Sequence, residues 1–198
     1  MTLDYSENEQ ETSMIGFGDT ENAWLTVYIA NRPPLDEYEH LDELKPLNPT
    51  EVAYIAKETG NHWRKIFNVY SKLVFSYLSQ KALTNIHKNT ETSWQAYREH
   101  CLLQNGSKIR LLFNAPSVDV IHSKIKCSDT IHLIMGKHYA QSTGFNEDHL
   151  EGMVRLDSDF AIWPAKKLIV CPYFDYRQLS NIKIDRLIEL MNSLEQSE

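Results

Sequence analysis

Four loops of the sequence combine asparagine, proline, glycine, aromatic and basic residues, and each of them follows a short apolar segment. The loops span residues 31–34, 114–117, 136–138 and 171–177. Amide and aromatic side chains can hold a flat polar ligand by hydrogen bonds and stacking, and basic side chains can bind phosphate. Asparagine and proline also end strands where no ligand is present. The loops therefore predict a binding site for a small polar ligand only if they meet in the fold.

The apolar segments before these loops have the composition of strands that are buried on both faces. They span residues 24–30, 109–113, 130–135 and 167–171, and a further short strand is expected near 153–156. Helical periodicity and capping signals place helices between these strands and at the end of the chain. We expect one helix that starts within residues 48–51 and stops at 59–60, and a short helix after Lys137. Further helices are expected over 62–80, 91–104, 117–124 and 181–194.

Strands that alternate with helices predict an α/β protein with a parallel sheet covered on both faces. We expect a three-layer sandwich with a short, mainly parallel four-stranded sheet flanked by helices. Residues 1–22 are polar and acidic and predict a partly ordered N-terminal arm, whereas residues 23–198 predict a single α/β domain. Ligands of such sheets bind beyond the carboxyl ends of the strands, so the four loops should share one rim.

The charge of the chain is unevenly distributed. The net charge is −7, but residues 61–140 contain eleven Lys or Arg and four Asp or Glu, a net charge of +7. Phosphate neutralisation supplies most of the affinity of sequence-independent duplex binding, so the overall acidity argues against that function. The basic middle segment still allows a local anion-binding face, while the acidic ends could serve only to solvate the protein.

Cysteine usage and the apolar segments indicate the cellular compartment. Cys101, Cys127 and Cys171 have no CxxC spacing, which indicates a reducing environment. A secretory signal has a basic segment followed by an apolar one, and residues 1–11 have neither. We therefore expect a cytoplasmic protein. No apolar run approaches the roughly 20 residues needed to cross a bilayer, so we expect no membrane partner.

Motifs for metals and cofactors are absent from the sequence. The eight histidines are scattered without an HExxH spacing, and Gly136 and Lys137 lack the spacing of a P-loop. We therefore expect no metal and no cofactor. Cys171 at a strand end could be a nucleophile or a buried structural thiol. Asp157 and Asp159 could be an acid–base pair or part of a solvated loop.

The order of these loops is similar to that of the uracil-DNA glycosylase superfamily, and most similar to its mismatch-specific branch. The turn Ala30-Asn31-Arg32-Pro33 resembles the Asn-Pro-Gly turn of that family, and residues 59–68 resemble the following segment, which lines the base pocket. Residues 134–139 resemble the family's strand followed by Gly-Lys. Residues 170–173 take the place of its final strand and of the loop that enters the minor groove.

The resemblance implies an N-glycosidic hydrolase in which Asn31 is catalytic and positions the attacking water. It implies that Phe67 or Tyr173 stacks on a base and that Lys137 and Arg177 hold phosphate. The family's His-Pro-Ser or Asn-Pro-Ser is Cys171-Pro172-Tyr173 here, so the group that stabilises the leaving base is missing. The ligand-binding residues of this interpretation are Arg32, Asn61, His62, Phe67, Asn68, Lys137, Tyr173 and Arg177.

Two functions from different classes follow from this sequence. The first is an enzyme or former enzyme with a glycosylase-like α/β fold that binds or hydrolyses a nucleobase or nucleotide, with single-stranded nucleic acid as a further partner. The second is a non-catalytic protein-interaction or small-ligand-binding module. The overall acidity and the missing leaving-base group favour the second function, whereas the clustered loop residues favour the first.

Overall fold

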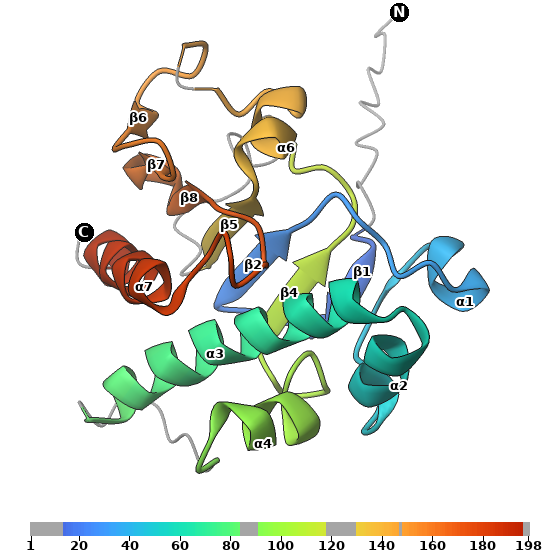
Figure 1. Ribbon diagram of the computed structural model, residues 1–198. Coiled ribbons are helices and arrows are strands. Elements are labelled where there is room, and N and C mark those ends of the chain that lie inside the picture. Colours follow the sequence, from blue (N-terminus) through green and yellow to red (C-terminus); the bar gives the residue numbers. More distant parts are fainter. Residues whose placement is uncertain (1–13, 84–90, 118–129, 147, 196–198) are drawn as a thin grey trace, which may run out of the picture.

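An eight-stranded mixed sheet runs through the computed structural model, which describes residues 14–83, 91–117, 130–146 and 148–195 (Figure 1). In spatial order the strands are β3 (Leu44–Lys45), β1 (Gly16–Gly18), β4 (Ile109–Leu112), β2 (Leu25–Tyr28), β5 (Ile131–Met135), β8 (Leu168–Cys171), β7 (Ala161–Trp163) and β6 (Val154–Arg155).

The four central strands are parallel and are the four predicted from the sequence. Strand β2 pairs in parallel with both β4 and β5, and β5 pairs in parallel with β8. The sheet is nevertheless larger and more mixed than the four-stranded sheet we expected. Strand β1 runs antiparallel to β4, and β7 runs antiparallel to both β8 and β6. The added strands have only two or three residues each, too few to show a hydrophobic period.

Both faces of the central sheet are covered, which explains why its strands are almost continuously apolar. One face presents a row of four side chains that pair in register: Leu111, Val27, Leu133 and Ile169. The next residue of each strand lies in a row on the other face: Leu112, Tyr28, Ile134 and Val170. The two rows belong to separate apolar clusters, so the sheet divides the core into two layers.

Helices cover the first face, and a helix with a long irregular segment covers the second. Figure 1 shows α3 crossing in front of the central strands, with α2 and α4 beside it and α7 at the left. Helix α6 packs against β5 and β8, and its Ala140 joins the cluster of the second face together with Phe145 and Met153. The helices are α1 (Asp36–Glu39), α2 (Glu51–Glu58), α3 (Asn61–Leu83), α4 (Trp94–His100), α6 (Lys137–Ser142) and α7 (Asn181–Glu195), with a 3-10 turn at Pro164–Lys166.

Most of the expected helices are confirmed. The helix expected over 62–80 is α3, and its apolar stripe is buried from Trp63 to Tyr77. The helix expected over 91–104 is shorter, because Ser93 caps α4 through a hydrogen bond from the N–H of Ala96. The helix expected near 117–124 falls almost entirely outside the described residues. No helix within the described ranges is long and apolar enough to cross a membrane.

Part of the expected N-terminal arm belongs to the sheet. Residues 14–22 are described and contain β1, whereas residues 1–13 lie outside the described part of the chain. Strand β1 needs its two glycines because it lies very close to β4. A Cβ atom on Gly16 would lie 2.1 Å from the carbonyl oxygen of Leu111, and one on Gly18 would lie 2.2 Å from that of Ile109. The glycine pair is therefore a packing requirement of the pairing between β1 and β4.

The second face of the sheet also holds a polar row, in which Thr26 and His132 are buried and Arg110 is partly buried. Arg110, Thr26 and His132 pair in register across three strands, and the hydroxyl of Tyr28 forms a 3.1 Å hydrogen bond with Nδ1 of His132. The imidazole is only 5% exposed. Burial, assisted by the charge of Arg110, lowers the pKa of His132 from 6.5 to about 4.

We expect His132 to make folding sensitive to acid. Between about pH 6.5 and pH 4 the unfolded chain binds a proton at His132 that the folded chain does not bind, so the free energy of unfolding falls as the pH decreases. The loss should approach about 3 kcal/mol. Urea unfolding across this range should show a shallower pH dependence for His132→Phe than for the wild type. If the free energy of unfolding has the same pH dependence in the two proteins, a group other than His132 causes the sensitivity to acid.

Candidate functional site

Three of the four predicted loops meet around one cavity of about 610 Å³ at the carboxyl ends of β2, β5 and β8. We call it the strand-end cavity. Asn31 enters it after β2, Lys137 after β5, and Tyr173 and Arg177 after β8. The fourth loop does not line it. The side chain of Asn114 instead accepts a hydrogen bond from the N–H of Ile15 and fastens β1 to the sheet.

A chain of hydrogen bonds holds the polar end of this cavity in place. The Tyr173 hydroxyl donates to Oδ1 of Asn31 at 3.0 Å, and Nε2 of His62 lies 3.0 Å from the same hydroxyl. Because the hydroxyl proton is directed to Asn31, the imidazole must supply the proton of its own bond. Burial, together with the charge of Asp175, raises the pKa of Tyr173, so the hydroxyl stays protonated at neutral pH. The amide nitrogen of Asn31 is left to donate to a ligand.

Helix α3 anchors the loop that carries Tyr173. Lys65 lies three residues after His62, on the same face of the helix, and its ammonium is 2.7 Å from the carboxylate of Asp175. The hydrogen bonds from Lys65 and from the N–H of Arg177 lower the pKa of Asp175. The aromatic ring of Tyr173 also stacks on His62, with ring centroids 5.8 Å apart. The loop after β8 is therefore fixed to a helix that lies far away in the sequence.

The charge of the strand-end cavity favours an anion. Lys137, Arg177 and Lys183 line it, and within the described part of the chain Asp159 is the single carboxylate of its lining. That carboxylate is already 2.9 Å from the ammonium of Lys183. Lys137 and Arg177 are exposed. Their charges are available to a ligand, and the site as a whole is positive in a protein of net charge −7.

The structure decides between the two interpretations of Cys171 and of the aspartates. Cys171 is fully buried, with its sulfur 3.4 Å from that of Met135, and burial raises the pKa of its thiol, so it is a structural residue. Asp157 accepts the N–H groups of two following residues and pairs with Arg186 at 2.6 Å, which makes it a loop-forming group. Among the described residues, no group of three or more His, Cys, Asp or Glu is placed to hold a metal ion.

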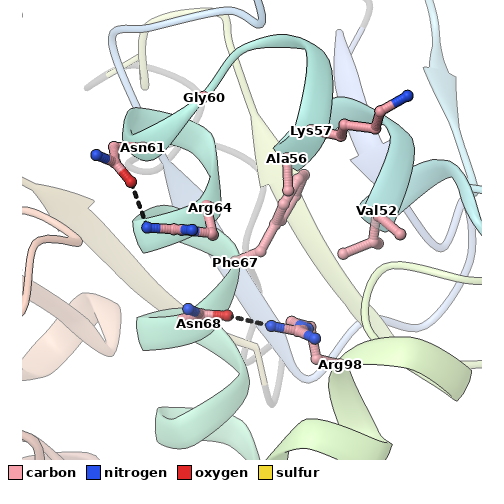
Figure 2. Close-up of a pocket in the computed structure, with 10 residues that line it drawn as sticks. Val52, Ala56, Lys57, Gly60, Asn61, Arg64, Phe67, Asn68 and Arg98 are labelled. Carbon is pink, nitrogen blue, oxygen red and sulfur yellow. Dashed lines mark hydrogen bonds between the residues drawn. The ribbon is translucent and has the colours of Figure 1, made fainter.

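The other predicted ligand-binding residues do not reach the strand-end cavity. Asn61, Phe67 and Asn68 line a second cavity of about 490 Å³ between α2, α3 and α4, which we call the helical cavity (Figure 2). Phe67 is fully buried there, so stacking of its ring on a base in the strand-end cavity is excluded. Arg32 donates to the carbonyl oxygens of Glu39 and Leu41 and so has a structural role.

Helix geometry explains why Asn61 lines the helical cavity, whereas the adjacent His62 lines neither cavity and instead contacts Tyr173. Asn61 and His62 are neighbours in sequence, but successive residues of a helix point about 100° apart. His62 therefore meets Tyr173, while Asn61 faces the helical cavity. Sequence reasoning missed Lys183 and considered Asp159 only as part of an acid–base pair or a solvated loop. The fold brings both residues to the strand-end cavity from segments without a recognisable motif.

Comparisons with known proteins give a family but no activity. A family model described as "Family of unknown function (DUF6942)" matches residues 15–192. Neither a comparison with curated proteins nor a comparison with solved structures found a match. Since the matched residues span most of the chain, the protein belongs to the DUF6942 family.

Proposed function

We propose that the strand-end cavity binds a mononucleotide or a closely related small ligand that joins a flat polar ring to a phosphate. The observation that carries this proposal is the meeting of Asn31, Lys137, Tyr173 and Arg177 around one cavity. They come from three loops that are distant in sequence. Each brings the type of group that such a ligand needs: an amide, an aromatic ring or a cation.

Cations and ring-binding groups both line this cavity. Lys137 and Arg177 can reach the phosphate as exposed cations, and a guanidinium can bind two phosphate oxygens at once. The Tyr173 hydroxyl holds the side-chain oxygen of Asn31 and so fixes the orientation of the amide. The amide nitrogen of Asn31 can then donate to a ring carbonyl of the ligand. The ring of Tyr173, which is held by His62, offers a surface for stacking.

The same charges favour a small ligand over a polymer. Three cations line the cavity, and one of them is paired with Asp159. Nucleic acids owe much of their affinity to neutralisation of many phosphates along a positive track. The other two cations, Lys137 and Arg177, fit a single phosphate group in this acidic protein, so we place mononucleotides ahead of single-stranded nucleic acid.

Hydrolysis of an N-glycosidic bond is the second candidate function. It rests on the resemblance to the uracil-DNA glycosylase superfamily and on the position of Asn31, directly beyond β2 and held by the Tyr173 hydroxyl. The carbonyl oxygen of Asn31 has a second lone pair, which can orient a water molecule. The replacement of the family's final motif by Cys171-Pro172-Tyr173 supports binding more than hydrolysis, because no group at that position can stabilise a leaving base.

The first prediction about the strand-end cavity concerns the phosphate of the ligand. Uridine monophosphate should bind the wild type more tightly than uridine, and Lys137→Gln with Arg177→Gln should weaken the nucleotide about tenfold or more because two charge-assisted contacts are lost. Isothermal titration calorimetry at low salt measures both affinities. Uridine binding should change little in the same double variant.

A matched control separates this effect from overall charge. Lys108 is an exposed lysine at the amino end of β4. The strand-end cavity lies at the opposite, carboxyl ends of the parallel strands. Lys108→Gln should leave nucleotide affinity within about twofold of the wild type at constant ionic strength. If the wild type binds neither uridine nor its monophosphate, the nucleotide proposal is wrong and the protein-interaction module becomes the better account.

The second prediction concerns Asn31. If the protein releases uracil from a uracil-containing oligonucleotide or from the nucleotide, Asn31→Ala should reduce the rate about a hundredfold, since loss of the correct position of a reacting water can cost roughly that much. Circular dichroism should show the same fold, because Asn31 is exposed. Base release can be followed by chromatography. Release that continues at the wild-type rate in Asn31→Ala would remove the residue from any catalytic role.

A further inference from the structure

The helical cavity lies outside the proposed nucleotide site and carries its own chemistry. Three cations, two amides and several apolar side chains line it, contributed by α2, α3 and α4 (Figure 2). It shares no lining residue with the strand-end cavity. We infer that the helical cavity is a second binding site, for a small ligand that carries a phosphate or carboxylate group.

The polar side chains of this cavity are all arranged as hydrogen-bond donors. The guanidinium of Arg98 donates to Oδ1 of Asn68 at 2.6 Å, and that of Arg64 donates to Oδ1 of Asn61, as Figure 2 shows. Each asparagine oxygen is therefore engaged, and each asparagine NH₂ group remains to donate. Arginine has no acceptor atom either. A lining of donors without a free side-chain acceptor selects a ligand rich in acceptors, which is the property of phosphate and carboxylate groups.

Among the residues that the structure describes, no carboxylate lines the helical cavity. Two lie beside it. Glu58 is 3.3 Å from Lys57, and Glu99 is 3.0 Å from Nη2 of Arg98. Both carboxylates are well exposed, at 40% and 55%, and exposed ion pairs of this kind contribute little free energy. A ligand anion can therefore compete with them for the ammonium of Lys57 and the guanidinium of Arg98.

The guanidinium of Arg98 is held in position before any ligand binds. Besides its bond to Asn68, it lies over the ring of Trp94, 5.8 Å from the centroid, and its side chain is only 26% exposed. Fixed donors lose less conformational entropy on binding than free ones. Buried Val52 and Phe67 give the cavity an apolar part between the three helices, beside the fixed guanidinium of Arg98.

The test is an NMR titration of the ¹⁵N-labelled full chain with inorganic pyrophosphate and, separately, with citrate. Binding of either anion should shift the backbone amides of residues 56–64 and of Arg98, and the two arms distinguish a phosphate ligand from a carboxylate ligand. Arg64→Gln with Arg98→Gln should weaken binding about tenfold or more. The matched control is Arg186→Gln, an arginine that lines neither cavity and pairs with Asp157, which should leave the affinity unchanged.

A second variant keeps the test valid if the double variant fails to fold. Asn68→Asp can keep the bond to Arg98 while it adds a negative charge to the cavity, so it should abolish anion binding and leave the spectrum otherwise folded. The inference is overturned if neither anion binds, or if the shifts fall only on residues 136–139 and 173–177. It is also overturned if Asn68→Asp binds either anion as tightly as the wild type does.

Discussion

The register of β4, β2, β5 and β8 is determined by burial of both faces of these strands. Side chains alternate between the two faces, so a slip of one residue would move Val27 and Leu133 into the layer that contains Tyr28 and Ile134. The slipped side chains would also meet partners of different size, because each layer is packed against its own helices or loops. The same parallel alignment places the carboxyl ends of these strands at a single edge, where the chain turns away into loops.

The strand-end cavity is a consequence of this alignment, but α3 completes it. The sheet alone brings Asn31, Lys137 and Tyr173 to one edge, and it does not determine how the loop after β8 is oriented. His62 and Lys65 on one face of α3 bind Tyr173 and Asp175, and these contacts join residues more than one hundred positions apart in the sequence. The hydroxyl of Tyr173 then fixes the amide of Asn31. A helix of the first layer therefore orients the polar groups of the proposed ligand site.

Strong local patterns explain what could be predicted from the sequence. Strand β2 and helix α3 are long or apolar enough to be recognised, and the convergence of Lys137 and Arg177 follows once the central strands are known to be parallel. Strands β1, β3 and β7 could not be recognised, because the pairing of two or three residues depends on neighbours that are distant in sequence. The rotation of α3 about its axis decides that Asn61 lines the helical cavity while His62 contacts Tyr173, and only tertiary packing determines that rotation.

A crystal structure of the full chain grown with uridine monophosphate tests the central claim most directly. Our account predicts the phosphate within hydrogen-bonding distance of Lys137 and Arg177, with the uracil ring beside Tyr173 and a ring carbonyl facing the amide nitrogen of Asn31. A nucleotide bound only in the helical cavity, or held elsewhere while the strand-end cavity stays free of it, would contradict this assignment.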